Sequence, residues 1–236
     1  MIGDILPPEV VVEEAFGDLP DVMLFPSEEA VIANAVGKRR AEFATGRACA
    51  RAALARLGLP PAPILPGLRG APQWPSGVVG SITHCAGYRA AAVARDGEVV
   101  TIGLDAEPHE KLPPGVLEAI ASPGEQARVA ALAAARPDVH WDRILFCAKE
   151  SVYKAWFPLT RQWLGFADAA VDIDPVHRTF AARLLVDGPV VNGVVLTGFE
   201  GRWLVSDGLI GTAIVVAAAP TTVGIVNRPA SPVRKR

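Results

Sequence analysis

The sequence is poor in cysteine and almost balanced in charge. Its 236 residues include only three cysteines, Cys49, Cys85 and Cys147. An odd number of cysteines so far apart fits neither a disulfide framework nor a zinc site. The formal net charge of −2 gives no reason to expect a nucleic-acid-binding protein. We therefore expect a protein of a reducing compartment, the cytoplasm, with no nucleic-acid partner.

No segment that would target the chain to a membrane or anchor it there is predicted from the sequence. It begins Met-Ile-Gly-Asp, without a basic region leading into an apolar stretch, so we predict no signal peptide. The most apolar run, residues 209–219, is too short to span a bilayer. Half of the residues are nevertheless hydrophobic, which at this length is ample for one large domain or two small ones.

The first half is predicted to place a long helix on an antiparallel meander. Ser27 is a candidate N-cap, and helix-forming residues then run to Leu57, with Gly58 as the stop. The three predicted strands comprise residues 78–83, 88–94 and 99–107.

Basic residues lie along this predicted helix. Arg40, Arg47 and Arg51 share one helical arc, either as a phosphate-binding edge or as an ordinary solvated face. His84 stands in the turn after the first strand, where a histidine is either a ligand-binding group or a surface residue.

The second half repeats the order of helices followed by strands. Helices are predicted for residues 115–120, 125–135 and 140–157, with Pro158 closing the last one. The predicted strands follow at residues 169–173, 179–186, 194–196, 202–205 and 210–217. The fold class is therefore α+β, with two similar subdomains, residues 1–112 and 113–220, and a basic tail at residues 221–236 that we expect to be disordered.

Two carboxylates at the end of the third strand are candidate metal ligands. Alternate residues of a strand share a face, so Asp105 and Glu107 point the same way as Gly103, which leaves open space beside them. Two such acids repel unless a cation lies between them, and Mg²⁺ is commonly held by carboxylates together with substrate phosphates. The alternative is a solvated strand end.

The best helical pattern carries a second pair of charged residues. Glu150 and Lys154 are spaced i and i+4 on the face opposite the apolar residues of 140–157, with Lys149 nearby. Such a pair is either an ordinary surface ion pair or part of a site.

Three motifs occur together in the order Gly80–His84, Ile102–Glu107 and Phe146–Trp156. In this order and at this spacing they resemble the signature of 4′-phosphopantetheinyl transferases. The chain is most similar to the single-chain, surfactin-activating type and its actinobacterial members. Each motif alone is common, but the ordered set is specific.

The resemblance implies a fold, a reaction and partners. Members of this family are monomers built from two pseudo-symmetric α+β halves, with coenzyme A in the cleft between them. They transfer the phosphopantetheine arm of coenzyme A to a serine of an apo acyl or peptidyl carrier protein and release 3′,5′-ADP. The segment 112–120 is similar to the region where relatives bind the apolar helix of the carrier.

The resemblance also implies roles for individual residues. Asp105, Glu107 and Glu150 would hold Mg²⁺, with Mn²⁺ as an alternative ion. Glu150 would act as base, metal ligand or both. The residues expected to bind coenzyme A are Asp105, Lys154, Arg39, Arg47, Arg69, Thr83 and His84.

One departure from the family concerns the loop rich in proline and glycine. Many relatives carry a lysine there, whereas this chain has Pro66 and Ala71 at the matching places and only Arg69 as a basic residue. Arg69 either replaces that phosphate contact or leaves it missing. Two other functions stay open, a Mg²⁺-dependent phosphohydrolase acting on nucleotides or coenzyme A, and a non-catalytic module that binds coenzyme A.

Overall fold

The computed structural model describes residues 1–218, so the tail predicted at residues 221–236 lies outside the described part. The helices are α1 (Pro26–Val31), α2 (Gly37–Arg56), α3 (Val116–Ile120), α4 (Pro123–Ala135) and α5 (Trp141–Thr160). The strands are β1 (Val11–Ala15), β2 (Val78–Cys85), β3 (Tyr88–Arg95), β4 (Val99–Pro108), β5 (Ala169–Asp174), β6 (Thr179–Leu184), β7 (Val190–Val191), β8 (Val194–Val195), β9 (Gly198–Ser206) and β10 (Leu209–Ala217). Short 3-10 turns occur at Ile2–Ile5, Leu68–Gly70 and Phe166–Asp168.

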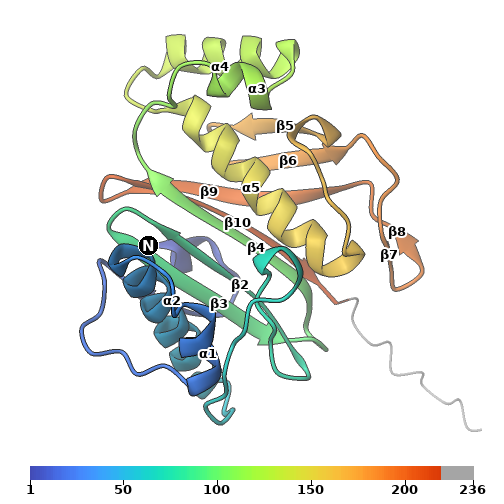
Figure 1. Ribbon diagram of the computed structural model, residues 1–236. Coiled ribbons are helices and arrows are strands. Elements are labelled where there is room, and N and C mark those ends of the chain that lie inside the picture. The colour runs from blue at the N-terminus through green and yellow to red at the C-terminus, as the bar shows by residue number, and fades with distance from the viewer. Residues whose placement is uncertain (219–236) are drawn as a thin grey trace, which may run out of the picture.

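The strands form two main antiparallel sheets, each covered by a long helix (Figure 1). A three-stranded sheet has the order β1-β3-β2 and packs against α2. A five-stranded sheet has the order β4-β10-β9-β6-β5 and packs against α5. The short pair β7-β8 stands apart from both sheets. The predicted α+β class with antiparallel sheets is confirmed, whereas the pseudo-symmetry of the two halves stays a prediction.

The predicted meander of the first half is wrong at its third strand. β2 and β3 form the expected hairpin, but β4 pairs with β10 in the larger sheet, with Asp105 opposite Thr212. The reason is that β1, a strand that the sequence pattern did not predict, occupies the other edge of β3. Sheet membership therefore does not follow the division at residues 112 and 113, and that division stays a prediction.

Two predicted helix boundaries also differ from the structure. The first helical region is two helices, and α1 begins at Pro26 rather than after Ser27. Its first turn is closed by the Glu28 carboxylate, which accepts a hydrogen bond from the backbone N–H of Phe25 at 3.0 Å. Pro26 fits the first position because its missing N–H has no helical partner there in any case.

The helix α5 continues through Pro158 to Thr160. Proline within the last turn removes only one backbone hydrogen bond, so the helix survives it. It ends at Arg161, which adopts a left-handed conformation and donates its backbone N–H to Phe157 O at 2.8 Å. This extra turn carries the C-terminal end of α5 towards the groove described below.

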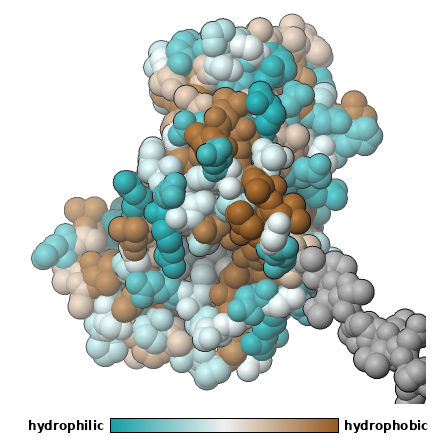
Figure 2. Space-filling view, turned by 90° about the vertical axis from the view of Figure 1, so that its right-hand side faces the viewer, coloured by the Kyte–Doolittle hydropathy of each residue, from teal (hydrophilic) through white to brown (hydrophobic). Residues whose placement is uncertain are grey.

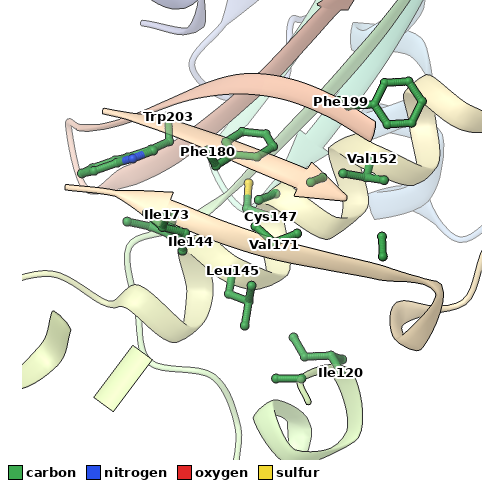
Figure 3. Packing of buried hydrophobic residues seen from close by; sticks show 14 of the residues in the cluster. Ile120, Ile144, Leu145, Cys147, Val152, Val171, Ile173, Phe180, Phe199 and Trp203 are labelled. Atoms are coloured by element: carbon green, nitrogen blue, oxygen red, sulfur yellow. The ribbon is translucent and has the colours of Figure 1, made fainter. Parts of the chain in front are cut away.

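A large apolar core fixes α5 on the five-stranded sheet (Figure 3). Ile144, Leu145 and Val152 of α5 are almost fully buried, as are Phe180 of β6 and Trp203 of β9. Burying each side chain of this kind stabilises the fold by about 1.5–3 kcal/mol. The helix is therefore a firm support for the polar residues on its opposite face.

Membrane-spanning helices are absent from residues 1–218. None of their helices combines the length and the apolar character that crossing a bilayer requires. On the face shown in Figure 2, apolar residues gather in several separate patches among polar ones. The apolar run at residues 209–219 contributes β10, an inner strand of the sheet.

Candidate functional site

Asp105 lies in the middle of β4, whose backbone is held along both edges. One edge pairs with β10. On the other edge the Ser81 hydroxyl accepts a hydrogen bond from the backbone N–H of Leu104 at 3.1 Å, and the Thr83 hydroxyl accepts one from Ala106 at 3.0 Å. β2 therefore contacts β4 through side chains rather than through a backbone ladder. Asp105 itself is only 5% exposed.

Gly103 allows α5 to lie directly on β4. A Cβ atom added at this position would lie 2.0 Å from the backbone oxygen of Ser151 and 2.8 Å from the backbone nitrogen of Ala155. The open space predicted beside the acids is therefore filled by helix backbone rather than by a ligand. This close approach brings Glu150 and Lys154 to the acids of β4.

Asp105 and Lys154 form the central ion pair of the site. Lys154 Nζ lies 2.7 Å from Asp105 Oδ1. The other carboxylate oxygen, Oδ2, is buried and has no hydrogen-bond partner among the described residues. A buried carboxylate oxygen without a partner is costly, and a hard cation would satisfy it. The chemistry of this site therefore fits a divalent ion such as Mg²⁺.

The electrostatics of the neighbouring groups point the same way. Desolvation, assisted by the charge of Asp105, raises the pKa of Glu107 to about 7. Desolvation and Asp105 likewise raise the pKa of Glu150. Burial acts to lower the pKa of Lys154, but the carboxylate of Asp105 outweighs it and the pKa is raised. Three carboxylates thus crowd one another in a partly dry region, which a bound cation would relieve.

The three acids do not form a ready-made set of metal ligands. Within residues 1–218, no group of three or more His, Cys, Asp or Glu side chains is arranged to hold a metal ion. Glu107 Oε2 lies instead 3.1 Å from Nη1 of Arg143 on α5. The structure thus brings Asp105, Glu107 and Glu150 to one region, and their joint role as metal ligands stays a prediction.

Arg39 and His84, both predicted to bind phosphate, lie side by side at the open end of β2. Arg39 Nη1 is 2.9 Å from His84 Nε2, and both residues are exposed. Desolvation and the positive charge of Arg39 lower the pKa of His84. An incoming anion would counteract the repulsion between Arg39 and a protonated His84, so this pair is suited to a phosphate.

The basic arc of α2 divides into one buried and two paired arginines. Arg47 is 7% exposed, donates from Nε to the backbone oxygen of Ile64 at 2.8 Å, and stacks on the Phe43 ring. Burial lowers its pKa to about 10, opposed by the charge of Glu28. No hydrogen bond from its two terminal nitrogens to a described residue is found.

The other arginines of that arc have partners within the first half. Arg51 lies 2.9 Å from the buried carboxylate of Glu28, and Arg40 forms an ion pair with Glu29. These two arginines are held by acids of α1. Of the three arginines predicted to form a phosphate-binding edge, Arg47 is therefore the best candidate, because Arg40 and Arg51 are already paired with acids.

The remaining predicted contacts lie apart from one another. Thr83 is 1% exposed and its hydroxyl accepts a hydrogen bond from β4, so its side chain supports the strand. Arg69 is exposed in the loop before β2 and lies over the Trp163 ring at 5.0 Å. The predicted contacts of Thr83 and Arg69 with coenzyme A remain untested.

A groove of about 480 Å³ runs between the two halves beside these residues. One wall is the Arg69–Trp74 loop with β2, and the other is the C-terminal part of α5. Glu150 and Lys154 face into it from α5, which joins the groove to the acidic site. Its other charged lining residues are Arg69 and Arg161, so the groove combines apolar walls with positive charge.

Lys149, adjacent to Glu150, serves the core rather than the site. Its Nζ lies 2.9 Å from Glu125 Oε1 and donates to the backbone oxygens of Phe166 and Ala169 at 2.7 and 2.8 Å. Neighbouring residues on a helix point about 100° apart, which separates the two roles.

Two residues of the site, Ser81 and Arg143, were not predicted from the sequence. Ser81 lies two residues before Thr83, so the alternation of strand faces could have identified it as a second support of β4. Arg143 lies two helical turns before Glu150, which places it on the same side of α5. The spacing was visible in the sequence, but nothing local indicated that Arg143 would meet Glu107.

Comparison with known proteins gives consistent matches over both halves. Residues 27–94 match the 4′-phosphopantetheinyl transferase N-terminal domain, and residues 101–196 match the 4′-phosphopantetheinyl transferase superfamily. The chain is 59% identical to 4′-phosphopantetheinyl transferase Svp of Streptomyces mobaraensis, over 94% of this chain and 92% of that protein. It is 50% identical to PptT of Mycobacterium tuberculosis (92% of this chain, 98% of that protein) and 49% identical to Npt of Nocardia iowensis (92% and 100%).

Proposed function

The chain belongs to the 4′-phosphopantetheinyl transferase superfamily, and from that premise we propose that its reaction takes place where α5 meets β4. The enzyme transfers the 4′-phosphopantetheine moiety of coenzyme A to a serine of an apo acyl or peptidyl carrier protein and releases 3′,5′-ADP. This is the activity of a holo-[acyl-carrier-protein] synthase.

The observation that carries the placement is the state of Asp105. One of its carboxylate oxygens is paired with Lys154 and the other is buried without a partner among residues 1–218. A buried carboxylate oxygen without a partner costs free energy that a purely structural ion pair would not need to lose. The arrangement is suited to a site that receives a cation and a diphosphate. Glu150 and Lys154 also line the groove between the halves, which could admit coenzyme A.

Asp105, Glu107 and Glu150 would hold Mg²⁺, with Mn²⁺ as an alternative. When bound, such an ion neutralises charge on the diphosphate and on the departing phosphate. Asp105 Oδ2 is best suited to bind the ion, because it is buried without a partner among residues 1–218. Glu107 and Glu150 would need to turn their carboxylates towards it.

Glu150 and Lys154 would handle the proton and the phosphate. The raised pKa of Glu150 makes it a better proton acceptor than an ordinary glutamate, so it is suited to take the proton from the attacking carrier serine. Lys154 keeps its charge because Asp105 raises its pKa, and a charged ammonium one helical turn from Glu150 can hold a phosphate oxygen.

The nucleotide end of coenzyme A would lie against the first half. Arg39 and His84 form an exposed pair there, and the terminal nitrogens of the buried Arg47 have no hydrogen-bond partner among residues 1–218. Arg69 in the facing loop would supply positive charge where many relatives have a lysine. The carrier protein would bind near residues 112–120, and we expect the enzyme to act as a cytoplasmic monomer.

The test is a mass measurement on a carrier domain. The protein is incubated with coenzyme A, Mg²⁺ and an apo carrier domain, and we expect the mass of one phosphopantetheine group to be added to the carrier. Glu150→Gln should abolish the increment, whereas Glu200→Gln, a matched change of an exposed glutamate on β9, should not. Release of 3′,5′-ADP without any carrier would instead indicate a phosphohydrolase.

A further inference from the structure

The segment that follows the acidic strand is held by the first turn of α5. Arg143 Nη1 lies 3.1 Å from Glu107 Oε2. The same guanidinium donates from Nε to the backbone oxygen of Glu110 at 3.0 Å and from Nη2 to that of Lys111 at 3.1 Å. One side chain therefore connects a carboxylate of β4 with two consecutive carbonyls of the segment leading to α3.

Two neighbours of Arg143 reinforce the same contact. Asp142 Oδ2 accepts a hydrogen bond from the backbone N–H of Leu112 at 2.9 Å. The backbone N–H of His140 donates to His109 Nε2 at 3.1 Å. Residues 107–112 are thus fixed to the beginning of α5, just as Asp105 is joined to its later part through Lys154.

We propose that Arg143 is a positioning residue, which orients the Glu107 carboxylate and fixes residues 108–112 for the transfer reaction. The proposal rests on the proposed function, because it assigns Arg143 to the metal-holding acids of that site. Within residues 1–218, Arg143 donates only to Oε2 of Glu107, so Oε1 is left for another partner. Groups that orient metal ligands are worth about 10–100-fold in metal affinity or activity.

Geometry and charge make opposite predictions for this arginine. As a mere positive charge, Arg143 would repel a divalent ion, and its removal would tighten metal binding. As a positioning group, it supplies three donors in a planar fork that lysine cannot reproduce. Its side chain is 14% exposed and that of Glu107 23%, so solvent does not fully screen either effect.

The experiment compares Arg143→Met, Arg143→Lys and the control Arg128→Met. Arg128 is a half-exposed arginine of α4, paired with Asp172 away from the site. Mn²⁺ affinity is measured by electron paramagnetic resonance on the full chain without coenzyme A. Thermal unfolding, and KM and kcat for coenzyme A, are measured on the same samples.

We expect Arg143→Met to bind Mn²⁺ about tenfold more weakly. Arg143→Lys should be intermediate, because it keeps the charge but not the fork, and Arg128→Met should be unchanged. The kcat of Arg143→Met should fall while its KM for coenzyme A stays within about twofold, because Arg143 does not line the groove. A purely structural role would lower the folded fraction without changing the affinity of the folded molecules.

Equal or tighter Mn²⁺ binding by Arg143→Met would overturn the proposal. Should that variant fail to fold, equal or tighter Mn²⁺ binding by Arg143→Lys would overturn the proposal in the same way. If the unaltered chain modifies no carrier, the proposed function is refuted instead. The comparison of Mn²⁺ affinity between variants would still test the positioning role of Arg143.

Discussion

The two long helices meet their sheets in different ways. Both α2 and α5 have twenty residues. A Cβ added at Gly46 of α2 would lie 3.4 Å from the Ile82 side chain of β2, an ordinary contact. A Cβ added at Gly103 would instead collide with the backbone of α5. Between α2 and β2 side chains separate helix and strand, whereas between α5 and β4 the two backbones touch.

This difference explains where the chemistry lies. Polar side chains near the middle of α5 can reach the acids of β4 only if the helix lies very close to the strand. Gly103 allows this close approach because it has no side chain. The first half needs no such contact, because α2 presents its arginines at an edge. The acidic site therefore depends on backbone packing, whereas the basic edge depends on individual side chains.

The largest effect is expected from the acids that α5 and β4 bring together. Asp105→Ala and Glu150→Ala should each reduce carrier modification about a thousandfold or more, because charge stabilisation worth several kcal/mol is lost. Circular dichroism should show an intact fold in both. Carrier modification at the unaltered rate by either variant would contradict the assignment of that residue as a metal ligand.

Gly103→Ala tests the backbone contact directly. The added methyl group has no room against Ser151, so we expect the free energy of unfolding to fall by about 3 kcal/mol. Gly46→Ala is the matched control and should stabilise α2 by about 0.5–1 kcal/mol. Urea denaturation measures the stability of both variants, and equal effects would contradict the difference between the α2–β2 and α5–β4 contacts.

Arg47→Ala probes the basic edge. Loss of a charged hydrogen-bonding partner should raise the KM for coenzyme A about tenfold while kcat at saturation changes little. The bond from Arg47 to Ile64 is also lost, so the melting temperature should fall as well. Steady-state kinetics at several coenzyme A concentrations separate these effects, and an unchanged KM would count against this arginine.

The smallest effect concerns pH. The pKa of Glu107 is raised to about 7, so this acid holds a proton below that pH and must release it before a cation binds. Mn²⁺ affinity should therefore rise with pH, by about threefold between pH 6.5 and 7.5, and level off above. Glu107→Gln should flatten the curve, and a flat curve in the unaltered chain would contradict the assignment.

Local patterns in the sequence predicted most of the elements and the candidate residues. The order of the three motifs pointed to Asp105, Glu107, Glu150 and Lys154, and the structure places these residues in one region. The apolar periodicity of residues 140–157 correctly predicted the buried face of α5.

Long-range pairing was beyond the reach of those patterns. β4 could pair equally well with β3 or β10 by its own sequence, and the choice was decided by β1, whose five residues carry little signal. For the same reason the contact of Arg143 with Glu107 could not be predicted, because it depends on where two distant segments meet.

The pairing of β4 with β10 has a consequence for biosynthesis. On the ribosome, β2 and β3 can fold as a local hairpin soon after they emerge, but the partner of β4 is made near the end of the described chain. Until then β4 has an unpaired apolar edge, which is a hazard for association with other nascent chains. Activity can therefore appear only after nearly all of the polypeptide has been synthesised.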